Sequence, residues 1–171
     1  EYRRQRQMCI RDSWATSYGR IDCMLTTADL LGNGAYEAVK DDKTYDGMLV
    51  YSVDCLAKTV LEIKDGVYTA AVYQNPPALA AANLKAAYDL LTGAETVVNT
   101  SVDSLLCTSD NVDQFIQMYI DQGQITEDEA KSHGYEAGSA KSILDEQSND
   151  SDEEDTEEAN DTAEDTETEA E

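Results

Sequence analysis

The chain has 171 residues and a formal net charge of −24 at pH 7, because 36 acidic residues are balanced by only 12 Lys or Arg. Phosphate backbones repel so acidic a surface, and the composition therefore argues against nucleic acid as a partner. No apolar run approaches the ~20 residues that a membrane-spanning helix needs. The N-terminus also lacks the charged-then-apolar pattern of a secretory signal.

The first residues differ in character from the rest. Residues 3–13, RRQRQMCIRDS, resemble the translation of a sequencing-library adapter, and the match continues codon after codon. We interpret residues 1–13 as adapter-derived and expect them to lack regular packing, although a native basic arm would have the same composition. A reading frame that opens in an adapter begins inside a gene. We therefore expect an N-terminal truncation, with the signal peptide lost by it.

The other end of the chain is strongly acidic. Residues 144–171 contain fifteen Asp or Glu, no Lys or Arg, and only one Leu and three Ala as apolar residues. Such a segment cannot bury enough surface to offset the entropy lost on ordering. We expect a disordered acidic tail that keeps the protein solvated, and one folded domain over residues 14–143.

The first half of this domain alternates between patterns typical of strands and of helices. Residues 21–26 (IDCMLT) form a short, mostly apolar run of strand length, and residues 29–40 carry apolar side chains near helical spacing. Residues 48–53 (MLVYSV) predict a second strand. Residues 55–63 have a helical apolar stripe, which ends at the stop signal Lys64-Asp65-Gly66.

The next elements continue this alternation. Residues 67–73 (VYTAAVY) are rich in β-branched and aromatic residues and predict a third strand. Asn75, Pro76 and Pro77 interrupt it. Residues 78–91 are rich in Ala and Leu and are followed by Gly93, which predicts a helix.

The last part of the domain completes the pattern. Residues 96–107 predict one or two short strands, and residues 112–122 predict an amphipathic helix. Thr126 and Glu129 have the spacing of a capping box. Strands separated by single helices indicate an α/β fold with a mainly parallel sheet and flanking helices.

Polar side chains follow each of the first three predicted strands, at residues 26–29, 52–54 and 74–75. Ligands of such sheets bind beyond the carboxyl ends of the strands, where loops lead into helices. These three segments are therefore the predicted ligand-binding site.

The same segments resemble the C-terminal half of ribose-binding-type solute receptors, which are type I periplasmic binding proteins. The family pattern is an Asn-Asp pair opening a helix with Gly-Ala, then Gly-aromatic-Asp after a strand, then a helix ending in Gly, and then a strand ending in Gln before Pro. The corresponding segments here are Thr27-Ala28-Asp29, Gly34-Ala35, Ser52-Val53-Asp54, Ile63-Lys64-Asp65-Gly66, Ala71-Val72-Tyr73-Gln74-Asn75-Pro76 and Thr108-Ser109-Asp110-Asn111-Val112. The resemblance covers about residues 20–115, and only the ordered combination is specific.

The resemblance implies a partial type I periplasmic-binding-protein fold, in which residues 14–143 are the C-terminal part. It implies an extracytoplasmic protein, in the periplasm or at the cell surface, that binds a sugar or a similar small polar ligand. Such a receptor delivers its ligand to the membrane permease of an ABC-type importer and is not an enzyme. The alternative is the effector-binding domain of a lactose-repressor-type transcription regulator, which the acidic tail disfavours because it would lie near DNA.

The resemblance also implies which residues contact the ligand. Asp54 and Gln74 occupy the positions of family residues that hydrogen-bond sugar hydroxyls. A carboxylate can accept from two hydroxyls while an amide donates and accepts, which suits a polyol. Ala28 stands where the family has a ligand-binding Asn, so Thr27 would have to substitute for it. Asp29 completes the candidate set.

Two departures and two alternatives bear on this set. Ser52 replaces the family Gly, which leaves the geometry of the following turn open, and Ala28 leaves open whether the ligand is a sugar. Asp29 and Asp54 each precede a predicted helix, so each could be an ordinary N-cap. Gln74, which precedes two prolines, could be an ordinary loop residue.

The remaining reactive residue types point to no other chemistry. Cys23, Cys55 and Cys107 lack the pairwise spacing of a zinc site, and we interpret them as buried free thiols. His133 is the only His and has no assignable nucleophile or orienting acid. The sequence therefore predicts no metal site, no cofactor and no catalytic residues.

Overall fold

The computed structural model describes residues 2–94 and 101–145. The chain divides into two compact units, Glu1–Val112 and Asp113–Glu171, and each is described by itself below. The first unit contains the sheet and all of the segments that the sequence predicts to bind ligand.

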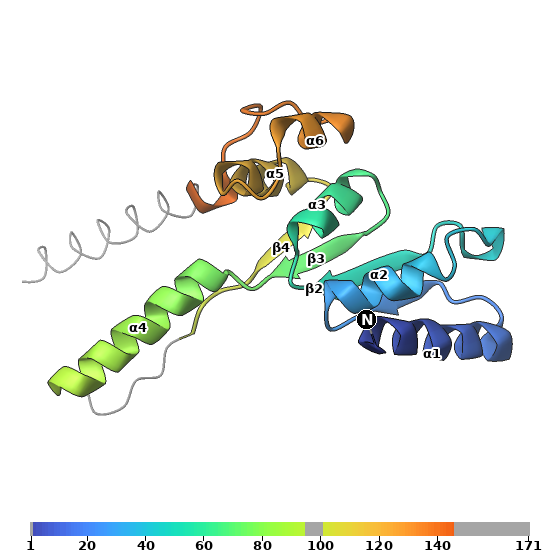
Figure 1. Cartoon of the computed structure of the whole chain (residues 1–171), viewed down its shortest axis with the longest axis horizontal. Helices are drawn as coiled ribbons and strands as arrows, with labels where there is room; N and C mark the ends of the chain where they lie inside the picture. Colours follow the sequence, from blue (N-terminus) through green and yellow to red (C-terminus); the bar gives the residue numbers. More distant parts are fainter. Residues whose placement is uncertain (1, 95–100, 146–171) are drawn as a thin grey trace, which may run out of the picture. The chain divides into compact units, whose positions relative to one another are not determined.

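The sheet of the first unit has the strand order β1-β2-β3-β4 (Figure 1). Its strands are β1 Cys23–Leu25, β2 Leu49–Val53, β3 Ala70–Tyr73 and β4 Leu105–Thr108. β1, β2 and β3 are parallel to one another, and β4 pairs antiparallel with β3. The predicted α/β class with a mainly parallel sheet is confirmed.

Two helices connect the parallel strands, as parallel pairing requires. They are α2, Asp29–Glu37, and α3, Ala57–Lys64. Right-handed crossovers between consecutive neighbouring strands place both helices on one face of the sheet. In the amide orientation that satisfies both groups, the Asn33 nitrogen of α2 donates to Glu62 Oε2 of α3 at 2.9 Å, so the two helices are neighbours.

Both helices are shorter than the sequence predicts. α2 ends at Glu37 instead of residue 40, and the chain then turns into a short 3-10 helix, Lys43–Tyr45. α3 begins at Ala57 instead of residue 55, because Asp54 and Cys55 have positive φ angles of 104° and 55° and cannot belong to a right-handed helix.

A buried tyrosine links α2 to the sheet. Tyr68, just before β3, is 2% exposed, and its hydroxyl donates to the backbone oxygen of Asp29 at 3.2 Å. Gly32 makes room for this ring, since a Cβ at that position would overlap the Tyr68 hydroxyl. The glycine therefore serves close packing, although glycine is unfavourable inside a helix.

Helix α4, Pro76–Thr92, is bounded by strong local signals. Asn75 accepts a hydrogen bond from the backbone N–H of Ala78 at 3.4 Å, and Gly93 ends the helix with a φ of 73°. None of its residues is buried, and Leu84 and Leu91 are 73% and 88% exposed. The helix that the sequence predicts over residues 78–91 is therefore present, and its Leu side chains are exposed.

The N-terminal residues form a helix, contrary to the expectation that residues 1–13 lack regular packing. α1, Tyr2–Tyr18, contains no Gly or Pro, contacts α2 and ends before Gly19, whose φ is 70°. Gln, Arg and Met are good helix formers, so a segment of almost any origin with this composition can take up a helix against a neighbour. The adapter origin of residues 1–13 stays a prediction, because conformation does not report origin.

The described part of the second unit includes the helices α5, Val112–Asp121, and α6, Glu127–Ser132. The predicted cap is present: Thr126 Oγ1 accepts from the backbone N–H of Glu129 at 3.2 Å. Tyr135, 1% exposed, donates its hydroxyl to Gln117 Oε1 at 2.9 Å. Most of the predicted acidic tail, residues 146–171, lies outside the described residues, as do residues 96–100 of the predicted short strands.

Over residues 2–94 and 101–145, no helix has the length and apolar character needed to cross a membrane.

We predict that Gly32→Ala lowers the free energy of unfolding by about 1–2 kcal/mol, because the clash with Tyr68 outweighs the gain in helix propensity of about 1 kcal/mol. Urea unfolding followed by circular dichroism measures this change. Leu30→Ala is the matched control, since Leu30 lies on the same helix but is 64% exposed. A Gly32→Ala protein as stable as the parent would contradict the packing role.

Candidate functional site: the carboxyl edge of the sheet

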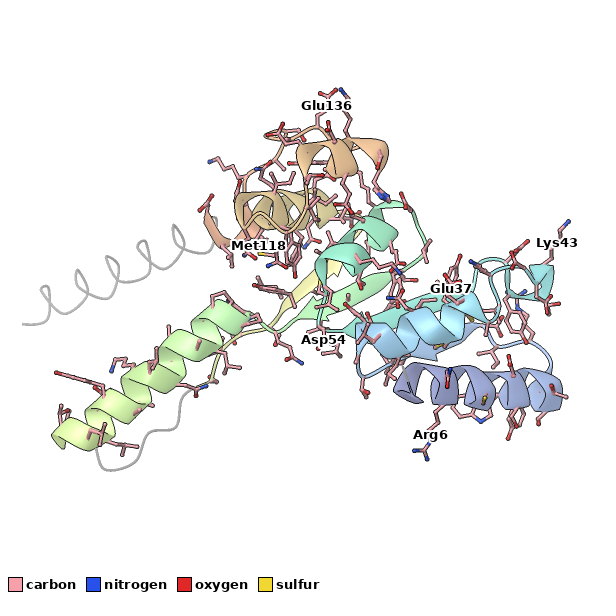
Figure 2. All side chains as sticks on the ribbon, viewed as in Figure 1. Arg6, Glu37, Lys43, Asp54, Met118 and Glu136 are labelled. Atoms are coloured by element: carbon pink, nitrogen blue, oxygen red, sulfur yellow. The ribbon has the colours of Figure 1, made fainter. Side chains whose placement is uncertain are left out.

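The carboxyl ends of three parallel neighbours meet at one edge of the sheet, which we call the carboxyl edge. Thr27 follows β1, Asp54 follows β2 and Gln74 follows β3. Thr27 and Gln74 are exposed and Asp54 is partly exposed. The structure therefore brings these three predicted residues to the same edge, and Figure 2 shows Asp54 there, close to the start of α2.

Asp54 occupies an unusual backbone conformation. Its φ of 104° lies in a region that favours glycine, and its backbone N–H donates to the oxygen of Val72 on β3 at 3.0 Å. Desolvation by burial and the negative charge of Asp29 raise the pKa of the Asp54 carboxyl, while the backbone N–H of Asp29 opposes this shift. Strained backbone and an unfavourable carboxylate environment are both common at binding sites.

Asp29 lies behind this edge and not on it. Its side chain is 0% exposed, and its two carboxylate oxygens have different partners. Oδ1 accepts from the Ser52 hydroxyl, and Oδ2 accepts from the backbone N–H of Leu56 at 2.7 Å. As a ligand contact, Asp29 stays a prediction; the structure shows it bonded to the loop between β2 and α3.

Both N-cap interpretations are wrong. The N-cap of α2 is Ala28, which makes no side-chain cap bond, so Asp29 is already the first residue of its helix. The N-cap of α3 is Leu56, two residues after Asp54. The loop is two residues longer than the sequence suggests, because the positive φ angles at Asp54 and Cys55 delay the start of the helix.

The residue after Gln74 has the capping role at the third strand end. Asn75 is 7% exposed, has a left-handed φ of 49°, and begins α4. Gln74 is exposed beside it and takes no part in that cap. Gln74 therefore lies at the surface of the carboxyl edge. This position agrees both with a ligand contact and with an ordinary loop residue.

Ser52 is the residue that sequence reasoning treated only as a departure. It is 2% exposed and lies in a row across the sheet with Ala71 of β3 and Cys107 of β4, both buried. Its hydroxyl donates to the buried Asp29. The sequence did contain a signal for this role, because Ser52 carries a hydroxyl group in an otherwise apolar strand. A buried hydroxyl group needs a hydrogen-bond partner.

Two cysteines lie behind the same turn. Cys55 and Cys107 are buried, and the hydrogen bond between them, together with burial, raises the pKa of the Cys55 thiol. These two positions agree with the interpretation of buried free thiols. Cys23 does not, because it is exposed on β1, an edge strand of the sheet.

A small cavity lies elsewhere in the unit. It has a volume of about 140 Å³ and is lined in part by Gly47, Met48, Gly66 and Val67, which precede β2 and β3. It is therefore at the amino ends of these strands, opposite the carboxyl edge. We locate the candidate site at the carboxyl edge because the polar, strained and desolvated groups gather there.

Within the described residues, no group of three or more His, Cys, Asp or Glu is arranged to hold a metal ion.

We predict that Asp54→Asn raises the free energy of unfolding at pH 7. A raised carboxyl pKa means that the folded state binds the proton more tightly than the unfolded state, so stability falls as pH rises through the raised value. The uncharged amide avoids this loss and can still accept from a backbone N–H. Urea unfolding at pH 7 and pH 3 tests this, with the gain expected only at pH 7. Asp110→Asn, an exposed position after β4, should give no gain at either pH.

Three solved structures of solute-binding proteins are similar to this chain. A myo-inositol binding protein from Caulobacter, bound to myo-inositol, has a TM-score of 0.57 and 26% identity over 64% of this chain and 38% of its own. An ABC transporter solute binding protein from Bacillus halodurans C-125, with bound myo-inositol, has a TM-score of 0.58 and 24% identity, covering 66% and 39%. A carbohydrate transporter solute binding protein from Chloroflexus aurantiacus, in complex with D-glucose, has a TM-score of 0.60 and 19% identity, covering 74% and 41%.

The latter two likenesses concern the fold alone, and this chain spans about two fifths of the length of these proteins. No curated protein sequence matches the chain. The sequence model of one protein family, the periplasmic binding protein domain, matches residues 9–95. The match begins inside the adapter-like segment, residues 3–13, and includes all three parallel strands. The resemblance to type I periplasmic binding proteins is thereby confirmed, and this chain belongs to the periplasmic binding protein domain family.

Proposed function

We propose that the carboxyl edge of this chain is one wall of a binding site for a sugar or a similar polyol in an extracytoplasmic solute-binding protein. The observation that carries the proposal is the convergence of Thr27, Asp54 and Gln74 at the ends of three parallel strands. The Caulobacter relative, which binds myo-inositol, supports the choice of a polyol.

The three side chains have the chemistry that a polyol needs. The Asp54 carboxylate can accept from two adjacent hydroxyls, and the Gln74 amide can donate to one hydroxyl and accept from another. The Thr27 hydroxyl would supply the polar group that Ala28 cannot. Asp29 is left out of the direct contacts, because both its oxygens have partners within the protein.

The proposal extends to the place of this protein in transport. Two of the similar structures are named as solute-binding proteins of ABC or carbohydrate transporters, which supports delivery of the ligand to a membrane permease. In this role the protein binds and releases its ligand without chemical change, so no catalytic residue is assigned.

We predict that the chain as it stands binds polyols weakly and at the carboxyl edge. Pockets normally bury about 70–90% of a small ligand, and an open edge cannot do so. Amide chemical shifts recorded during titration with myo-inositol, and separately with D-glucose, should change around Thr27, Asp54 and Gln74, with a dissociation constant on the order of 1 mM. Micromolar binding would show that the site is complete within this chain. An absence of shifts at about 100 mM ligand, well above such a constant, would contradict the proposed function.

We further predict that Asp54→Ala and Gln74→Ala each weaken this binding by about 1–3 kcal/mol, because each leaves a ligand hydroxyl without its partner. The midpoint of the titration should then move to a ligand concentration roughly 5- to 150-fold higher. Asp110→Ala and Gln122→Ala are matched controls at exposed positions and should leave the titration unchanged. If both Asp54→Ala and Gln74→Ala retain full binding, these residues do not contact the ligand.

A further inference from the structure

We propose that Asp29 and Ser52 are positioning residues, which hold the Asp54–Cys55 turn in the conformation that presents the Asp54 carboxylate at the carboxyl edge. The inference rests on the proposed function, because it names what orients the residue that meets the polyol. It assigns no ligand contact to either residue.

The Asp29 carboxylate bridges the two ends of the turn. Its Oδ1 accepts from the hydroxyl of Ser52, which lies two residues before Asp54. Its Oδ2 accepts from the backbone N–H of Leu56, two residues after Asp54, at 2.7 Å. The five-residue stretch of chain from Ser52 to Leu56 is thus held at both ends by a single side chain.

The turn needs such support because its backbone is unfavourable. Asp54 and Cys55 have φ angles of 104° and 55°, and neither is glycine. Conformations of this kind persist only where the surrounding structure holds them. On one side the Asp54 N–H donates to Val72 on β3, and on the other the Asp29 carboxylate holds Leu56.

Asp29 is itself fixed, which lets it act as a rigid anchor. It is 0% exposed, and its backbone oxygen accepts from the hydroxyl of Tyr68. Buried carboxyl oxygens need hydrogen-bond donors, and Ser52 and Leu56 supply one to each oxygen of Asp29. Removing either donor would leave a carboxylate oxygen without its partner and would allow the side chain to move.

Ser52 distinguishes this chain from the sequence pattern that it otherwise resembles. The position carries Gly in that pattern, and Gly has no side-chain donor for Asp29. Ser52 is 2% exposed and sits in the strand immediately before the turn, so its hydroxyl is directed to the carboxylate and not to the carboxyl edge. This chain therefore supplies its own restraint on the turn.

The charge arrangement is consistent with the same role. Asp29 and Asp54 are both acidic and close enough for the charge of one to raise the pKa of the other. The backbone N–H of Asp29 donates to the Asp54 carboxyl, which holds this carboxyl at the start of α2, beside the carboxyl edge.

Nuclear magnetic resonance of the full chain tests the proposal with four variants. Asp29→Ala removes the bridge, and Ser52→Ala removes one of its donors. Asp29→Asn is the conservative variant, since its amide can accept from Leu56 N–H and donate to Ser52 Oγ. Thr59→Val is the matched control: Thr59 is 0% exposed, and its hydroxyl has no hydrogen-bond partner within the described residues, so this change removes a buried hydroxyl and no bond.

The first readout is hydrogen exchange at the Leu56 amide, which needs no ligand. We expect exchange at least about tenfold faster in Asp29→Ala, an intermediate increase in Ser52→Ala, and exchange close to the parent in Asp29→Asn and Thr59→Val. The second readout is the myo-inositol titration, in which Asp29→Ala and Ser52→Ala should reduce the shifts at Asp54 while Asp29→Asn retains them.

The outcomes separate this proposal from the proposed function. Unchanged Leu56 exchange in Asp29→Ala, or in Ser52→Ala if Asp29→Ala does not fold, would overturn the positioning role. Loss of the myo-inositol shifts in the control Thr59→Val would also overturn the positioning role. Any change to a buried side chain would then be enough to abolish binding. If the unsubstituted chain shows no myo-inositol shifts, the proposed function fails, and exchange at Leu56 still decides whether Asp29 holds the turn.

Discussion

The buried carboxylate of Asp29 is the interaction on which the site depends. It lies at the start of α2 and bonds to Ser52 at the end of β2 and to Leu56 at the start of α3. Taking a charge out of water is costly unless donors replace the water, and here the donors come from a neighbouring strand and loop. The same bonds that satisfy the charge therefore fix three elements relative to one another. Tyr68, just before β3, donates its hydroxyl to the backbone oxygen of Asp29, and the close approach of its ring explains a glycine inside α2.

This arrangement produces a turn that is poor for stability and suitable for binding. Asp54 has a positive φ and a raised carboxyl pKa, and both features oppose folding. Binding benefits from them, because a carboxylate that is already oriented and partly desolvated loses less on meeting a ligand. The neighbouring side chains Thr27 and Gln74 are exposed. We therefore regard Asp54 as the preorganised member of the proposed site.

The structure also defines what the carboxyl edge alone can achieve. A ligand resting on an open edge keeps contact with water on its far side, so its hydrogen bonds compete with solvent. The chain spans about two fifths of the similar solute-binding proteins, and the apolar side of α4 is exposed, with Leu84 and Leu91 mostly accessible. The first fact agrees with a chain that forms one wall of the proposed site. The second shows that, within the described residues, no other element covers these apolar side chains of α4.

The sequence by itself determined the order and type of the main elements from β1 to α4, because strand runs, helical stripes and stop signals such as Lys64-Asp65-Gly66 and Gly93 act locally. It also indicated the edge on which polar residues gather, since parallel strands share the direction of their carboxyl ends.

The sequence did not determine the packing of α1 on α2, the exposure of Cys23 or the delayed start of α3. Only the tertiary structure decided the role of Asp29, because its partners are 23 and 27 residues away and a local pattern reads only an N-cap. The physical reason is that a buried charge is satisfied by whichever donors the fold brings to it, and these come from other elements of the sheet.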